Sequence, residues 1–116
     1  MDYEITAIEF ATKLRQSQGS SNLNYKEKPV LLDVREPWEH QTARVEGSVL
    51  IPMGEIPARA YSELDPDAHI VVMCHHGARS MSVAVWLRNQ GFERAQSLAG
   101  GIEEWSRTVD PGVPRY

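Results

Sequence analysis

The chain has 116 residues, 41% of them hydrophobic, and a formal net charge of −4. This length and composition predict one soluble globular domain, spanning residues 1–116, with a substantial core. Acidic and basic residues are interspersed, which argues against nucleic acid or an anionic membrane as a partner. The single cysteine excludes an internal disulfide, a C-x-x-C redox pair and a cysteine-rich zinc site.

The N-terminal segment carries acids where a signal peptide would carry bases, and no apolar region follows it. No apolar run is long enough to span a bilayer. We therefore expect a cytoplasmic protein with a reduced thiol. For the oligomeric state, which the sequence leaves open, a monomer is the default expectation.

The first predicted elements are a short strand from Tyr3 to Ile5 and an amphipathic helix. Thr6 and Glu9 have the spacing of a capping box at the start of the helix, and Gly19 fits its stop signal. The polar stretch from Gln16 to Lys28 is interpreted as a surface loop. The apolar face of the helix is formed by Ala7, Phe10, Ala11 and Leu14.

The continuous apolar run from Val30 to Val34 predicts a strand that is buried on both faces. Pro37 suits the first turn of a short helix that includes Trp38 and Glu39. A second strand is expected from Ser48 to Ile51, and a helix from Glu55 to Leu64.

A third buried strand, Ile70 to Met73, leads into the segment that holds the cysteine. The helix expected after it, Met81 to Gln90, is apolar almost all round, which predicts deep burial, and Gly91 fits its C-terminal stop. The remaining expected elements are a strand from Arg94 to Leu98, a turn at Gly100-Gly101 that leads into a short helix through Trp105, and an irregular tail from Val109 to Tyr116.

Strands that alternate with helices predict an α/β fold, an open parallel sheet with helices on both faces. Ligands of such sheets bind in the crevice at the carboxyl ends of the strands. Because Cys74 directly follows a strand, the pattern places it at that edge.

The most informative segment is Cys74-His75-His76-Gly77-Ala78-Arg79-Ser80, a loop between a strand and a helix. Free amides and the dipole at a helix N-terminus stabilise a thiolate, the reactive form of cysteine, and Gly77 allows the backbone to bend around it. The loop therefore favours a reactive cysteine. The alternative is a buried, inert core thiol.

The other polar residues of the loop each have two interpretations. His75 and His76 either line the mouth of a pocket and attract an anion or simply face solvent, and two adjacent histidines are a weak metal signal. Arg79 either binds the anion or, as we favour, pairs inward with a carboxylate such as Asp33 or Glu36.

Ser80 either caps the helix or donates its hydroxyl to the sulfur, and capping is the simpler interpretation. Asp33 ends an apolar strand, so it should lie near the same edge of the sheet and hold Arg35 or orient a loop. Trp38 and Trp105 are interpreted as packing residues.

The strand, the cysteine loop and the helix after it together resemble the active-site loop of single-domain rhodaneses. The stretch Ala43-Arg44-Val45 departs from the Gly-His-Ile that this family often shows. Three further segments resemble the family in order along the chain: Asp33-Val34-Arg35-Glu36 with Trp38-Glu39, the stretch from Gly47 to Pro52, and Leu98-Ala99-Gly100-Gly101 with Trp105.

The resemblance implies a rhodanese-like five-stranded parallel sheet and a sulfurtransferase without cofactor or metal. Cys74 would attack a donor such as thiosulfate, release sulfite and hold the sulfur as a persulfide. Cyanide in an assay, or a thiol in the cell, would then accept the sulfur. The implied substrate-binding residues are His75, His76, Gly77, Ala78, Arg79 and Ser80, with Asp33 and Arg35 in support.

Because the chain has no second cysteine, the acceptor must come from outside, either as a small thiol or on a partner protein. The donor is expected to be thiosulfate or a protein persulfide, since mercaptopyruvate enzymes have small, uncharged loops.

Two other functions remain open. A related phosphatase or arsenate reductase would have five residues between the cysteine and the arginine, and this chain has four between Cys74 and Arg79. A non-catalytic rhodanese-like module that binds a partner or carries sulfur is the other alternative.

Overall fold

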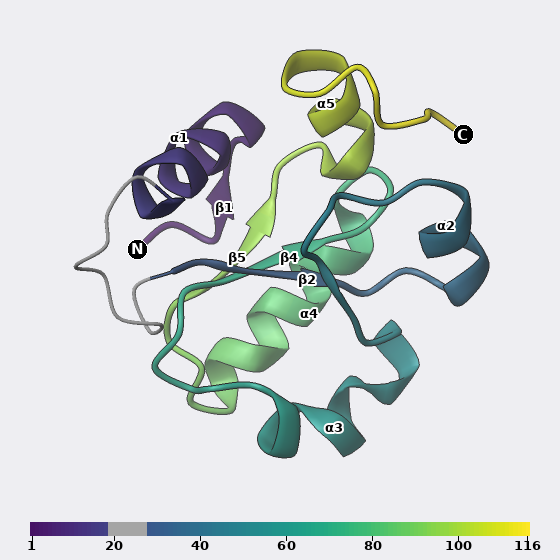
Figure 1. The fold of residues 1–116 in the computed structure, drawn as a ribbon. Coiled ribbons are helices and arrows are strands. Elements are labelled where there is room, and N and C mark those ends of the chain that lie inside the picture. The colour runs from purple at the N-terminus through teal and green to yellow at the C-terminus, as the bar shows by residue number, and fades with distance from the viewer. Residues whose placement is uncertain (19–27) are drawn as a thin grey trace.

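The computed structural model describes residues 1–18 and 28–116, which form a parallel β-sheet covered by helices on both faces (Figure 1). Its five strands lie in the order β1-β5-β4-β2-β3, and every neighbouring pair is parallel. The predicted fold class is therefore confirmed. The strands are β1 (Glu4–Ile5), β2 (Val30–Asp33), β3 (Val49–Leu50), β4 (Ile70–Met73) and β5 (Ala95–Leu98).

Helices α1 and α5 lie on one face of the sheet, and α3 and α4 lie on the other (Figure 1). No helix in the described ranges is long and apolar enough to cross a membrane. The helices are α1 (Ala7–Gln18), α2 (Pro37–Thr42), α3 (Ile56–Glu63), α4 (Ala78–Asn89) and α5 (Gly101–Thr108), with a 3-10 turn at Met53–Glu55 before α3.

Strand β4 is the centre of the molecule, and each of its four residues is 0% exposed. Because successive side chains of a strand point to opposite faces, Ile70 and Val72 join the core under α3 and α4. Val71 and Met73 join the core under α1 and α5. This two-sided burial explains the continuous apolar run in the sequence.

The capping box at the start of α1 is confirmed by two reciprocal hydrogen bonds. The Thr6 amide donates to Glu9 Oε1 at 3.0 Å, and the Glu9 amide donates to Thr6 Oγ1 at 3.1 Å. These bonds satisfy amides that have no partner within the helix.

The predicted loop from Gln16 to Lys28 is wrong at its start, because residues 16–18 belong to α1. Residues 19–27 of that stretch lie outside the described residues. Ser17 lies on the buried side of this last turn, where its hydroxyl donates to the carbonyl of Leu14 at 2.9 Å. This local bond lets a polar residue continue the helix. The expected stop at Gly19 lies outside the described residues.

Helix α4 begins three residues before the predicted Met81. The reason is Gly77, which occupies the N-cap position with φ +117°, so that its carbonyl accepts from the Met81 amide at 3.1 Å. The expectation of deep burial all round is also wrong, because Val85 is 38% exposed. One face alone packs on the sheet, through Ser80, Val83, Ala84 and Leu87.

The other boundaries differ by small amounts. Helix α3 begins at Ile56 rather than Glu55, because the chain first makes the 3-10 turn. Gly91 ends α4 as predicted, with φ +100°. The tail after α5 is irregular, also as predicted.

Candidate active site

Cys74 lies at the carboxyl end of the central strand, immediately before the loop that leads into α4. The residue is 1% exposed, so the sulfur is enclosed by the loop rather than presented on the surface. This is the edge of the sheet that the sequence predicted for it.

The Cys74 sulfur is surrounded by hydrogen-bond donors from the loop and the first turn of α4. The Gly77 amide donates to Sγ at 3.0 Å and the Ser80 amide at 3.3 Å, and the Ser80 hydroxyl lies 3.4 Å from Sγ. Amides that converge at a helix N-terminus stabilise negative charge. The geometry therefore suits an ionised sulfur.

The predicted capping role of Ser80 is wrong, because Gly77 occupies the N-cap position. Ser80 instead lies in the first turn, fully buried, with its hydroxyl between Sγ and the carbonyl of Gly77, 3.2 Å away. Because Ser80 is buried beneath the loop, its hydroxyl faces the Cys74 sulfur instead of solvent.

The underside of the loop rests on the N-terminus of α5. The Ile102 amide donates to the Cys74 carbonyl at 2.9 Å, and the Glu103 amide donates to the His75 carbonyl at 3.2 Å. A Cβ atom on Gly101 would lie 2.5 Å and 2.4 Å from these two carbonyl oxygens. The sequence assigned Gly100-Gly101 to a turn and gave no sign of this support for the loop.

Arg79 points inward, as predicted, but its partner is Glu39 of α2 rather than Asp33 or Glu36. Two hydrogen bonds of 2.7 and 3.0 Å join the guanidinium to the two carboxylate oxygens. The bonds from Arg79 lower the pKa of Glu39 to about 2. The ion pair fixes the start of α4 against α2 and occupies the guanidinium fork.

Asp33 and Arg35 form a second ion pair, fully buried, beside the first. Arg35 Nε and Nη2 donate to the two Asp33 oxygens at 2.8 and 2.7 Å, and His40 Nδ1 lies 2.8 Å from Asp33 Oδ2. Arg35 also donates to the carbonyl of Ala43 at 2.6 Å. These contacts hold α2 in place, which agrees with a supporting position for both residues.

His75 and His76 form a stack with Tyr116, a residue of the tail. The ring centroids of His75 and Tyr116 are 4.0 Å apart, and the two ring planes are nearly parallel, with an angle of 9° between them. The ring of His76 also stacks on His75, with a centroid distance of 4.0 Å. Burial, and then the charge of His76, lower the pKa of His75. His76 and Ala78 are exposed, so the loop presents these two residues to solvent.

Tyr116 connects the two ion pairs and was missed by the sequence analysis. Its hydroxyl donates to Glu39 Oε2 at 2.6 Å and accepts from Arg35 Nη1 at 2.9 Å. Burial raises the pKa of Tyr116 to about 12. Trp38, interpreted as a packing residue, is 60% exposed and packs edge-on with the Tyr116 ring. Trp105, interpreted in the same way, is buried.

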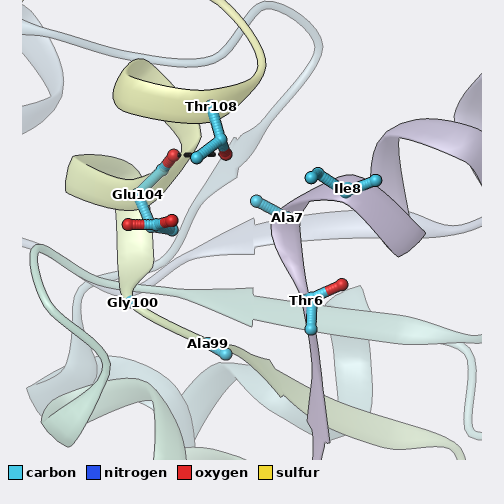
Figure 2. A pocket seen from close by; sticks show the side chains of 7 residues that line it. All are labelled: Thr6, Ala7, Ile8, Ala99, Gly100, Glu104 and Thr108. Atoms are coloured by element: carbon cyan, nitrogen blue, oxygen red, sulfur yellow. Dashed lines mark hydrogen bonds between the residues drawn. The ribbon is translucent and has the colours of Figure 1, made fainter.

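A pocket of about 470 Å³ lies between α1 and α5 (Figure 2). Figure 2 shows Glu104 and Thr108 of α5 facing Ala7 and Ile8 of α1, with Ala99 and Gly100 below them. No residue of the cysteine loop lines it. In the described residues we also find no group of three metal-ligating side chains.

Comparisons with known proteins agree with this geometry. The family model described as Rhodanese-like domain matches residues 13–108. A thiosulfate sulfurtransferase, GlpE, of Pseudoalteromonas translucida is 33% identical over 90 residues, covering 78% of this chain and 85% of that protein. The crystal structure of a rhodanese-related protein from Thermoplasma volcanium superposes with a TM-score of 0.78 at 25% identity, covering 99% of this chain and 100% of that one.

The chloroplastic rhodanese-like/PpiC domain-containing protein 12 of Arabidopsis thaliana is 38% identical over 95 residues, or 79% of this chain. The chain spans only 32% of that protein. The segment that the family model matches, residues 13–108, includes β2, the cysteine loop and α5. The chain therefore belongs to the rhodanese-like domain family.

Proposed function

We propose that this protein is a sulfurtransferase that carries sulfur as a persulfide on Cys74. The observation that supports this most directly is the pair of amides that donate to Sγ, at 3.0 and 3.3 Å, with the Ser80 hydroxyl 3.4 Å from the sulfur. Donors of this kind stabilise a thiolate before the reaction and the negative sulfur of a persulfide after it.

In the first half of the reaction, the Cys74 thiolate attacks the outer sulfur of thiosulfate. The new bond joins Sγ to that sulfur, and the sulfur–sulfur bond of thiosulfate breaks, so its electron pair leaves with sulfite. In the second half, the carbon of cyanide or a thiolate attacks the outer sulfur. The electron pair of the persulfide bond then returns to Sγ, and the enzyme is regenerated.

The proposed donor is thiosulfate or a protein persulfide, and similarity to a thiosulfate sulfurtransferase supports the first. The exposed imidazole of His76 lies at the mouth of the loop, where it can meet an anionic donor. Arg79 is a less suitable anion ligand, because Glu39 already occupies its fork. The proposed acceptor is an external thiol, free or on a partner protein, because this chain has one cysteine.

The alternative is a rhodanese-like domain that binds a partner or carries sulfur without turnover. The observation that favours it is the 1% exposure of Cys74, which leaves the sulfur little access to a donor. A catalytic domain would have to open the loop or admit a donor that reaches the sulfur directly.

The test is intact-protein mass spectrometry before and after incubation with thiosulfate. We expect the protein to gain one sulfur atom on Cys74, to lose it on addition of cyanide, and to gain none in the Cys74→Ser variant, which should remain folded. If thiosulfate, a small-molecule persulfide and a protein persulfide all fail to load the protein, catalysis is excluded in favour of the binding module. Turnover of an aryl phosphate instead would identify a phosphatase.

A further inference from the structure

Ser97 is a buried hydroxyl next to the cysteine loop that no motif singled out. It lies in β5, opposite Val72 of β4, and is 0% exposed. Side chains two residues apart on a strand share a face, so Ser97 points to the same side as Ala95, toward α4. A hydroxyl at such a position costs stability unless it forms a hydrogen bond.

The partner of Ser97 is Ser80, on the first turn of α4. Their Oγ atoms are 2.7 Å apart, and Ser80 Oγ is 3.4 Å from Cys74 Sγ. Within residues 1–18 and 28–116, the Ser97 hydroxyl has no other hydrogen-bond partner. The two serines and the cysteine thus form a continuous chain of polar groups inside the protein.

A count of hydroxyl protons and lone pairs shows which hydrogen bonds Ser80 can form with its neighbours. Ser80 has one hydroxyl proton and two lone pairs, and three groups surround it: Sγ, Ser97 Oγ and the carbonyl of Gly77. While Cys74 is a thiol, its proton can point to Ser80, and Ser80 donates to the carbonyl. Once the sulfur is ionised, it only accepts, so a bond between Sγ and Ser80 Oγ requires the Ser80 proton to turn toward the sulfur.

We propose that Ser97 is a positioning residue, whose hydroxyl donates to Ser80 and thereby keeps the single Ser80 proton available for the negatively charged sulfur. A hydroxyl that accepts one hydrogen bond is a stronger donor in the next. Ser97 acts on the sulfur only through Ser80. The inference rests on the proposed function in one respect, that the ionised sulfur is the reactive species.

The test is to follow the ultraviolet absorbance of the Cys74 thiolate against pH in the wild-type protein and in Ser97→Ala. Cys74 is the only cysteine, so the Cys74→Ser variant supplies the baseline for every other group. This readout requires neither reagent access nor a sulfur donor. It therefore stays valid even if the protein fails to transfer sulfur.

We expect the thiolate of Ser97→Ala to appear at higher pH, by about half a unit, because one link in a chain of hydrogen bonds to a charged atom is lost. The matched control is Ser17→Ala, which removes another buried hydroxyl, one that lies in α1 and donates to the Leu14 carbonyl at 2.9 Å. Its profile should coincide with that of the wild type. The charged and titratable groups around the sulfur are unchanged in both variants: Glu39, His75, His76, Arg79, Glu103 and Tyr116.

Two further variants separate the role of Ser97 from a general loss of structure. In a Ser80→Ala background, Ser97→Ala should cause no additional shift, because the intermediate hydroxyl is gone. Ser97→Thr keeps the hydroxyl and should match the wild type, and it decides the question if Ser97→Ala does not fold. The proposal is wrong if Ser97→Ala matches the wild type, if Ser17→Ala shifts equally, or if Ser97→Thr shifts as Ser97→Ala should.

Discussion

Gly101 is the residue that lets α5 support the cysteine loop from below. Its φ is +61°, and an added Cβ would lie 2.4 to 2.5 Å from the carbonyl oxygens of His75 and Cys74. Two separate costs therefore oppose any side chain at this position, a strained backbone and a collision with backbone atoms that cannot move freely.

We expect Gly101→Ala to lower the free energy of unfolding by about 3 kcal/mol or more, because both costs apply. Gly47→Ala is the matched control, since Gly47 has φ +85° but nothing within 4 Å of an added Cβ. It should cost only about 1 to 2 kcal/mol. Urea unfolding measures both, and equal losses would show that the close contact under the loop contributes nothing.

At the scale of elements, the irregular tail after α5 completes the wall of the site. Val113 is buried, its carbonyl accepts from Ser106, and Arg115 forms an ion pair with Glu103. These contacts hold the tail along α5 and bring Tyr116 onto the His75 ring. A segment without regular structure thus has a defined position because its side chains are anchored one after another.

Tyr116→Ala should raise the pKa of His75 toward its ordinary value, because burial is the main cause of the lowering and Tyr116 covers one face of the ring. Tyr116→Phe keeps the ring and should leave this pKa low, although it removes the hydrogen bonds to Glu39 and Arg35. Titration of the histidine ring protons by NMR measures the difference.

The control for these variants is Arg107→Gln, which removes an exposed ion pair with Glu104 on α5 and leaves the contacts of the tail in place. It should leave the His75 titration unchanged. A His75 pKa that stays low in Tyr116→Ala would mean that the loop itself, and not the tail, buries the imidazole.

For the whole molecule, the ion pair of Glu39 and Arg79 links α2 to the start of α4. It also makes the stability of the fold depend on pH. Because the folded pKa of Glu39 is about 2, below its ordinary value of 4.5, the pair contributes fully above about pH 4.5. That contribution is lost as the pH falls from there to about 2. Its size is at most about 3 kcal/mol, and less in practice, since Arg79 is 36% exposed and water screens the pair.

Glu39→Gln should therefore be less stable than the wild type at neutral pH, and the gap should narrow as the pH falls toward 2. Urea unfolding at several pH values measures this convergence. Glu63→Gln is the control, because Glu63 also has a lowered pKa, from Arg59, but lies on the surface. A constant gap between Glu39→Gln and the wild type would mean that the carboxylate charge is not the source of the stability.

The sequence by itself determined the elements that depend on local patterns. The apolar run of β4 marks a strand buried on both faces, and the spacing of Thr6 and Glu9 fixes the start of α1. Gly77 lies three residues after Cys74 and has a left-handed backbone conformation. Its amide, at the start of the helix that follows, therefore donates to the sulfur. Each of these features arises from residues a few positions apart, where geometry follows from the chain itself.

Only the tertiary structure decided which distant groups meet at this edge of the sheet. Arg79 pairs with Glu39, 40 positions away, rather than with Asp33, because Arg35 already holds that carboxylate. The contacts of Tyr116 with Glu39 and of Ser97 with Ser80 likewise join separate elements. Periodicity and motifs describe one element at a time, whereas packing of the sheet, helices and tail determines these contacts.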